Sequence, residues 1–176
     1  MNTFVPRGAH YLAGALELDD KRLGKQLVEC QQIYDALRTG YPLHILHHPA
    51  TQMWDGQLDA LLTYAFDIYL AYRRRFPGST HKSGGYLTGL TSRLEVQPPE
   101  WVALLAPYHR AKLYHKNPEH YAQYQTDEPD LAHYPITKDG RLIGWVHRPD
   151  KKWLLDDGTY HSTAWAAIQV ARSKDA

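Results

Sequence analysis

The sequence predicts a mainly α-helical protein, a compact single-domain helical bundle with a small C-terminal β-hairpin. Apolar residues recur at steps of three and four over two long segments, residues 20–38 and 54–75, as on the buried face of an amphipathic helix. Beyond Pro129, two short strand-like segments flank a Lys-Asp-Gly turn, a pattern typical of a hairpin. The 176 residues fit one domain, and 43% of them are hydrophobic, which is enough to build a core.

The first half of the chain is expected to contain two long helices. Residues 1–18 look irregular, and Asp19 and Asp20 then occupy N-cap positions. Gly40 supplies a C-terminal stop, so the spacing predicts a helix over residues 20–38. His48-Pro49 is a favourable start for the second, central helix, which the periodicity extends to Arg75.

The second half is expected to contain shorter elements. Glycines and prolines make most of residues 78–98 a predicted loop. We expect a helix over residues 100–106, a shorter one over 108–116 and a turn through 118–124. A hairpin over residues 136–146 and a last helix over 162–172 complete the chain.

Composition excludes some classes of protein. The only cysteine, Cys30, rules out an internal disulfide framework, and its place on an apolar helix face favours a buried hydrophobe over a nucleophile. We find no apolar run of about 18 residues and no signal-peptide core, so we expect a soluble, cytoplasmic protein. A net charge of +1 gives no general reason to expect nucleic-acid binding, which must be argued from where charges lie.

Two local patterns in the sequence are compatible with a nucleic-acid-binding surface. Arg22, Lys25, Glu29 and Gln32 share one face of the first long helix, which fits either a carboxylate beside a phosphate-binding surface or an ordinary solvated face. Residues 101–118 lack acidic side chains and interleave cations with aromatic rings, which fits a surface that tracks DNA or basic stems that cover apolar surface. The histidines there match no zinc spacing, so we expect no metal.

Three blocks carry a family resemblance over about residues 1–125. The first consists of Leu18, Asp20, Arg22, Leu23 and Glu29. The second consists of His47, His48, Pro49, Met53, Trp54, Asp55 and Gly56. The third consists of His109, Arg110, Leu113, Lys116, Asn117, Pro118, Glu119, His120 and Tyr121. With these blocks the chain resembles the pyrimidine-dimer DNA glycosylase (endonuclease V) superfamily, in particular its bacterial and phage branch.

The resemblance implies a DNA-repair glycosylase or glycosylase/AP lyase that acts on a damaged or modified pyrimidine in double-stranded DNA without a cofactor. The family attacks the sugar C1′ with the N-terminal α-amine, and Glu29 takes the place of its catalytic carboxylate, with Arg22 beside it. Type members have threonine after the initiator methionine, whereas this chain has Asn2. The nucleophile is therefore left open between the amine of Met1, the amine of Asn2 and no amine nucleophile at all. A water-activating Glu29 or an internal lysine such as Lys25 is the next candidate.

The DNA-binding surface implied by the resemblance and the local charge is made of eight residues: Lys25, His48, His109, Arg110, Lys112, Lys116, Tyr121 and Tyr124. We expect a monomer in which a glycosylase-like helical domain, residues 1–128, carries a packed extension, residues 129–176. The N-terminus should lie folded against the first long helix near Glu29, anchored by Phe4 and Val5. Two other hypotheses are a non-catalytic DNA-binding module and a same-fold enzyme with different chemistry on modified phage DNA.

Overall fold

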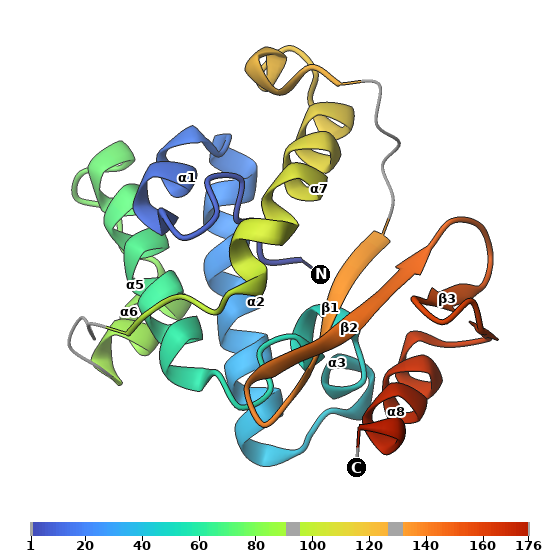
Figure 1. The fold of residues 1–176 in the computed structure, drawn as a ribbon. Helices are drawn as coiled ribbons and strands as arrows, with labels where there is room; N and C mark the ends of the chain where they lie inside the picture. Colours follow the sequence, from blue (N-terminus) through green and yellow to red (C-terminus); the bar gives the residue numbers. More distant parts are fainter. Residues whose placement is uncertain (1, 91–95, 127–131, 176) are drawn as a thin grey trace.

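The computed structural model describes residues 2–90, 96–126 and 132–175. Over these residues the chain forms eight α-helices and one four-stranded antiparallel sheet, so the predicted mainly α fold class is confirmed. Figure 1 shows α1, α2, α5 and α6 on one side of the molecule and the sheet with α8 on the other. The elements in order are α1 (Tyr11–Glu17), α2 (Asp20–Thr39), α3 (Leu43–Leu46), α4 (Pro49–Gln52), α5 (Leu58–Arg75), α6 (Lys82–Gly89), α7 (Trp101–Lys116), the 3-10 turn η1 (Ala122–Tyr124), β1 (Ala132–Lys138), β2 (Arg141–Arg148), β3 (Trp153–Leu155), β4 (Tyr160–His161) and α8 (Ala164–Lys174).

The first predicted helix is confirmed as α2. The Asp19 side chain caps its start by accepting a hydrogen bond from the Arg22 backbone N–H at 2.8 Å. Gly40 ends it in the left-handed conformation with φ 74°, where a glycine carries no steric penalty. Its apolar face, which includes Cys30, is buried except near its C-terminal end, and α2 packs against α5 and α6.

Two of the predicted helix boundaries are wrong. Residues 11–17 form α1 in a segment that looked irregular. The predicted helix from Pro49 to Arg75 is divided into α4 and α5 by Gly56, which has φ 73°. A Cβ at Gly56 would come within 2.7 Å of the Gly140 backbone nitrogen, so close approach of the hairpin turn requires a glycine here.

In two further regions the structure contains more helix than the sequence predicts. The predicted loop over residues 78–98 contains α6, although residues 91–95 of that range lie outside the described residues. Gly84 lets α6 pack directly on Tyr69 of α5, where a Cβ would overlap the ring. The two helices predicted over 100–106 and 108–116 are one helix, α7, which continues through Pro107.

The C-terminal hairpin and last helix are confirmed, and the sheet is larger than predicted. The strands β1 and β2 pair over longer segments than expected, and β3 and β4 extend the sheet in the order β1-β2-β3-β4. Arg172 of α8 donates to Gln52 Oε1 in α4 at 2.7 Å and to the Thr137 carbonyl in β1 at 2.7 Å. These contacts tie the sheet and α8 to the helical part of the molecule.

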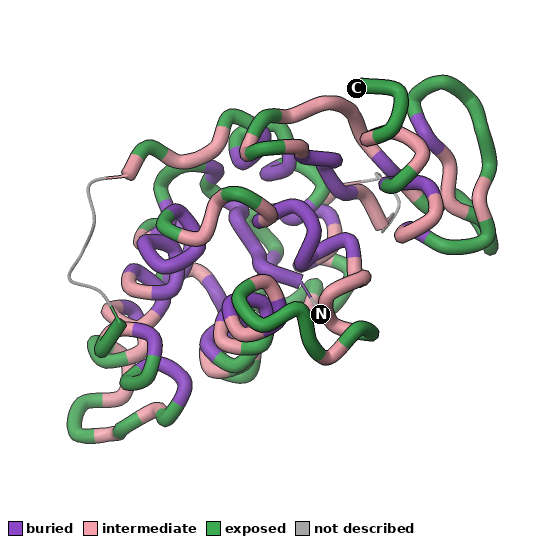
Figure 2. Tube along the Cα trace, turned by 90° about the horizontal axis from the view of Figure 1, so that it is seen from below, coloured by how far each residue is buried: buried purple, intermediate pink, exposed green. Residues whose placement is uncertain are grey.

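The buried residues form one cluster that includes side chains from α1, α2, α5, α7, the sheet and α8. Figure 2 shows buried backbone where these elements face one another and exposed backbone in most of the loops. The stretch of residues 2–6 is buried as well, and Figure 1 shows the start of the chain between α2, α7 and β1. Burial of residues so near the start of a chain is unusual, because the first few residues of most domains are poorly ordered unless other contacts hold them.

Candidate active site at the N-terminus

Gln26 of α2 connects the first residues of the chain to Glu29. Its amide nitrogen donates to the Asn2 carbonyl at 2.9 Å and to Glu29 Oε2 at 3.0 Å. Its amide oxygen accepts from the Phe4 backbone N–H at 2.7 Å and lies 2.7 Å from the Tyr64 hydroxyl, which donates. Only a side chain with both a donor and an acceptor can satisfy this set, so a buried glutamine fits where glutamate or leucine would not.

Three more contacts hold the same segment. The Trp54 indole N–H donates to Thr3 Oγ1 at 2.9 Å, and the Tyr64 hydroxyl lies 2.9 Å from the Phe4 carbonyl. The Val5 backbone N–H donates to His109 Nδ1 at 3.0 Å. Because Asn2 is only 6% exposed and lies at Gln26, the prediction that the N-terminal segment folds against this helix near Glu29 is confirmed.

Burial keeps His109 neutral. It lowers the pKa of this imidazole to about 3, and the charge of Lys112 acts in the same direction. A neutral ring whose Nδ1 accepts a backbone N–H carries its proton on Nε2. His109 therefore anchors Val5 with a fixed tautomer, and the Phe4 ring packs edge-on against it with centroids 5.3 Å apart.

A cavity of about 450 Å³ opens at this point. Its walls are supplied by the N-terminal segment and by the polar face of α2. Further lining side chains come from the start of α4, from α7 and from β1. The lining residues are Asn2, Phe4, Lys21, Arg22, Lys25, Gln26, Glu29, His48, Lys112, Lys116 and Tyr134. We call this cavity the N-terminal pocket.

Glu29 is the carboxylate of the N-terminal pocket. It is 5% exposed, and besides the Gln26 contact its Oε1 lies 3.6 Å from the ammonium of Lys25, one helical turn away. Five cationic side chains line the same pocket, so its positive charge exceeds its negative charge. An electropositive pocket with one buried carboxylate can attract a phosphate backbone and stabilise a cation that develops beside Glu29.

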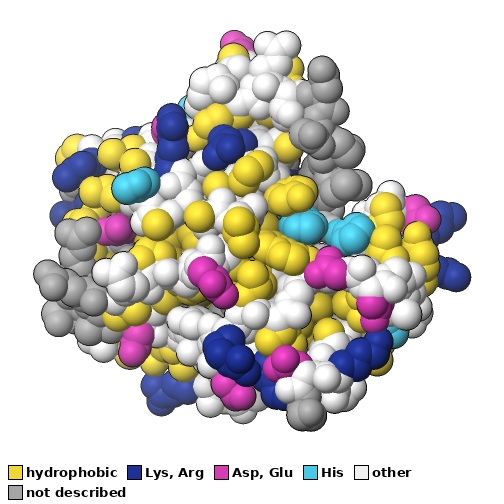
Figure 3. Space-filling model, in the orientation of Figure 1, with side chains coloured by type: hydrophobic (Ala, Val, Ile, Leu, Met, Phe, Trp, Pro, Cys, Tyr) yellow, Lys and Arg dark blue, Asp and Glu magenta, His cyan; other side chains and the backbone are white. Residues whose placement is uncertain are grey.

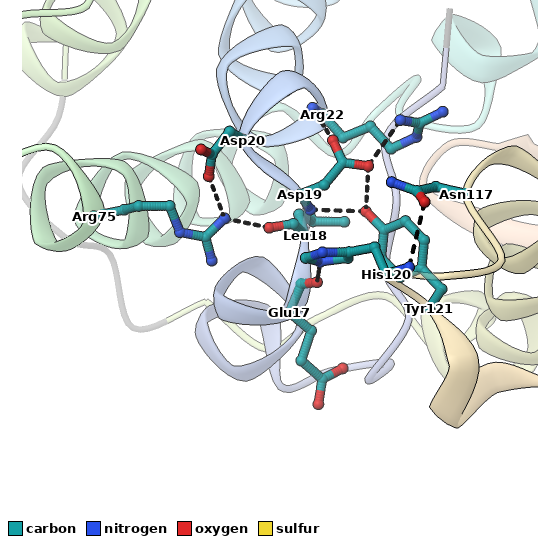
Figure 4. Close-up of polar contacts among 9 residues, drawn as sticks. All are labelled: Glu17, Leu18, Asp19, Asp20, Arg22, Arg75, Asn117, His120 and Tyr121. Atoms are coloured by element: carbon teal, nitrogen blue, oxygen red, sulfur yellow. Dashed lines mark hydrogen bonds and ion pairs between the residues drawn. The ribbon is translucent and has the colours of Figure 1, made fainter.

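Arg22 is fixed by the start of α2. Its guanidinium pairs with Asp19 Oδ2 at 2.8 Å, and Asp19 Oδ2 also accepts from the Tyr121 hydroxyl at 3.1 Å. Figure 4 shows Tyr121 and His120, from the segment after α7, meeting the α1–α2 junction. Burial alone would raise the pKa of the Asp19 carboxyl, but its contacts with Arg22 and Tyr121 hold that pKa below its ordinary value.

His48 lies on another wall of the N-terminal pocket and caps α4. Its Nδ1 accepts the Ala50 backbone N–H at 3.1 Å, and its ring meets the Tyr134 ring edge-on with centroids 6.1 Å apart. Burial, together with the charge of Lys112, lowers the pKa of His48 to about 4, so the ring is uncharged at neutral pH.

The structure brings together most of the residues that the sequence nominated. Those that line the N-terminal pocket are Asn2, Arg22, Lys25, Glu29, His48, Lys112 and Lys116. Met1 lies outside the described residues.

Four nominated DNA-binding residues are not brought to the N-terminal pocket. His109 and Tyr121 are buried at 2% and 0% exposure, and they hold Val5 and Asp19. Tyr124 is also buried and donates to Glu17 Oε2. The Arg110 guanidinium donates to the Pro6 carbonyl at 3.0 Å. Each of the four contacts the N-terminal segment, the end of α1 or the start of α2.

Sequence reasoning missed Lys21, Gln26 and Tyr134. Lys21 precedes Lys25 by four residues and Gln26 precedes Glu29 by three, so helical spacing places both beside nominated residues. For Tyr134 there is no such local signal, because it reaches the pocket from β1, more than 100 residues after Glu29.

Outside the pocket the surface gives few further indications of a site. On the face shown in Figure 3, lysine and arginine side chains stand among acidic and hydrophobic ones and form no single large patch. Among residues 2–90, 96–126 and 132–175, no group of three or more His, Cys, Asp or Glu side chains could hold a metal ion. No helix in those ranges is long and apolar enough to cross a membrane.

Comparison with known proteins gave one match. A family model described as pyrimidine dimer DNA glycosylase matches residues 1–81. A search of curated proteins and a search of solved structures returned no match. The matched range contains Asn2, Arg22, Lys25, Glu29 and His48, whereas α7 and the sheet follow it. The chain thus matches the pyrimidine dimer DNA glycosylase family over residues 1–81, which confirms the resemblance that its motifs indicate.

Proposed function

We propose that the protein is a DNA glycosylase with AP-lyase activity that excises a damaged or modified pyrimidine from double-stranded DNA. The observation that carries the proposal is the contact set of Gln26, which joins the N-terminal segment to Glu29 inside one electropositive pocket. The matched family acts on DNA by its description, which supports the substrate class.

In the proposed reaction the terminal α-amine is the nucleophile. An α-amine has a pKa of about 7.7–8.0, so a useful fraction is neutral near pH 7.5, whereas a lysine ammonium stays charged. The amine nitrogen bonds to the sugar C1′ as the bond from C1′ to the base nitrogen breaks, and the base leaves with that electron pair and takes up a proton. Loss of the amine proton and opening of the sugar ring then give an imine between C1′ and the protein.

Glu29 would act on the charge that develops at C1′. An ionised carboxylate stabilises the cationic sugar and the protonated imine, and it can shuttle the protons that the amine releases. The same carboxylate can remove a proton from C2′, after which the 3′ phosphate leaves by β-elimination and the strand is cut. Lys25, whose ammonium lies 3.6 Å from Glu29 Oε1, would pair with the carboxylate and hold it in position.

The cationic side chains of the N-terminal pocket would hold the DNA backbone. Lys21, Lys25 and Lys116 are exposed enough to reach phosphates, and Lys112 lines the same pocket but is half-buried. We assign His109, Arg110, Tyr121 and Tyr124 to a supporting role, since their contacts hold the N-terminal segment, the end of α1 and the start of α2. Residues 129–176 would act with the helices as part of one monomeric unit.

The proposal is tested with duplexes that each carry one thymine dimer, one oxidised pyrimidine, one uracil or one abasic site. Incubation with sodium borohydride reduces an imine and leaves a covalent protein–DNA product. Trapping with at least one damaged duplex and with the abasic duplex is the expected result. Binding without any trapping or excision would favour a non-catalytic DNA-binding module instead.

A further inference from the structure

The lining of the N-terminal pocket is chemically divided. Its cations come from α2 and α7, its carboxylate comes from α2, and the buried N-terminal segment also lines it. The remaining wall contains two uncharged rings, His48 at the start of α4 and Tyr134 of β1. A nucleotide has a matching division into an anionic phosphate, a sugar and a flat aromatic base.

The ring wall is held in place. Tyr134 is 5% exposed, and the Trp153 ring of β3 lies behind it with centroids 6.2 Å apart. The backbone of Tyr134 is paired with Val146 in β2. His48 is fixed by its Nδ1 contact to the Ala50 N–H, and its lowered pKa, about 4, leaves it uncharged at neutral pH. A base can therefore contact two rings that are held in a fixed orientation and carry no charge.

The pocket is also large enough to enclose part of a nucleotide. Its volume of about 450 Å³ falls within the range of about 300–1,000 Å³ that is usual for pockets that surround small ligands. Enzymes that act on a base within duplex DNA commonly turn the nucleotide out of the stack and enclose it in such a pocket. The walls then fix its orientation: phosphates toward the lysines, C1′ toward Glu29, and the base toward the rings.

We propose that His48 and Tyr134 form the base-binding wall of the N-terminal pocket, and that Tyr134 makes the C-terminal sheet a determinant of which base is excised. The inference rests on the proposed glycosylase function and deepens it. It assigns substrate recognition to a strand that lies outside the part of the chain matched by the family model. The same pocket with another residue at position 134 would accept a different set of bases.

An abasic site separates this inference from the proposed function, because it offers the sugar and phosphates without the base. For each variant we would measure base excision from a panel of thymine-dimer, oxidised-pyrimidine and uracil duplexes, and borohydride trapping on the abasic duplex. The variants are Tyr134→Leu, which removes the ring, and His48→Asn, which removes a ring but keeps an acceptor able to cap α4. The control is Ile136→Ala, two residues along β1, buried at 1% exposure and not part of this pocket.

The ratio of excision to abasic trapping should fall roughly five- to a hundredfold in Tyr134→Leu and His48→Asn, the range expected when one stacking ring is removed from a base. In Ile136→Ala both rates should fall together, in proportion to the folded fraction. If Tyr134→Leu leaves the ratio and the order of preferred bases unchanged, the inference is wrong although the proposed function stands. If one of these two variants loses its fold, the other is judged by the same ratio and the same order of preferred bases. Wild-type protein that traps only the abasic duplex would overturn the base wall together with the proposed glycosylase activity, and wild-type protein that traps none would overturn the lyase activity as well.

Discussion

Gln26→Leu is the substitution that most sharply tests whether the N-terminal segment must be held at Glu29. Leucine has similar size but removes all four of the hydrogen bonds at 2.7–3.0 Å that Gln26 makes. The Phe4 N–H and the Asn2 carbonyl lose this partner, and a buried polar group left unsatisfied costs about 1–3 kcal/mol. For these two groups together, the free-energy difference between the held and the released segment would shift by roughly 2–6 kcal/mol toward release, because both groups are hydrated in water.

Release moves the α-amine away from its attacking position. A misplacement of about 1 Å can reduce a rate by about a hundredfold, so we expect the first-order rate of borohydride trapping on abasic DNA to fall by about that factor or more. DNA affinity should change little, because the lysines of the N-terminal pocket are untouched. Gln26→Glu should also be impaired, since an ionised glutamate cannot donate to the Asn2 carbonyl and adds a second negative charge beside Glu29.

Gln52→Leu is the matched control for Gln26→Leu. Gln52 is also a buried glutamine, 3% exposed, but its amide contacts the Leu46 carbonyl and Arg172 at the junction of α4 and α8. It should lower the melting temperature and leave the trapping rate of the folded protein unchanged. A Gln26→Leu protein that folds and traps abasic DNA at the wild-type rate would refute the reasoning.

Three further predictions concern charge. Glu29→Gln should lower the trapping and excision rates by roughly 10²-fold or more with DNA affinity nearly retained, and unchanged turnover would remove Glu29 from the mechanism. Lys116→Gln should reduce the slope of log affinity against log salt concentration by about 1. The control is Lys151→Gln, an exposed lysine between β2 and β3, which should leave the slope unchanged. Equal slopes for the two variants would contradict a phosphate contact of Lys116. Folding stability should fall as pH drops from 6.5 toward 3. His109 has a pKa of about 3 in the folded protein, so over this range only the unfolded chain takes up a proton at this residue. The free energy of unfolding should therefore decrease by about 1.4 kcal/mol per pH unit across that window. His109→Gln should flatten the profile of melting temperature against pH between 6 and 4, and an unchanged profile would contradict a neutral buried imidazole.

The parts of the fold that could be predicted are those specified by local sequence. The helix α2 has a capping aspartate, an apolar stripe and a terminal glycine, and each of these acts within a few residues of chain. The helix α6 could not be found in this way. Its adjacent Gly84 and Gly85 are typical of a loop, and what stabilises the helix is the close packing of Gly84 on Tyr69, a tertiary contact.

The candidate site likewise contains some residues whose position local sequence specifies and others whose position depends on tertiary contacts. Arg22, Lys25 and Glu29 share a helix face, so their proximity could be inferred from spacing alone. The sequence places His109 and Tyr121 on a DNA surface, because a basic, aromatic segment has the same composition whether its rings face solvent or the core. The structure buries both rings and leaves the neighbouring Lys116 exposed. Tyr134 enters the site only because β1 packs on α4 and α7.

The central claim is that the N-terminal α-amine, held beside Glu29, forms the covalent intermediate. The direct measurement is to trap the native, untagged protein on abasic DNA with borohydride, digest the product, and locate the DNA-bearing residue by peptide mass together with the mass of the mature N-terminus. The account predicts that the DNA is attached to the α-amine of the first residue and that an N-terminal extension or acetylation abolishes trapping while DNA binding persists. Attachment to an internal lysine such as Lys25, or full activity of a protein with a blocked amine, would contradict it.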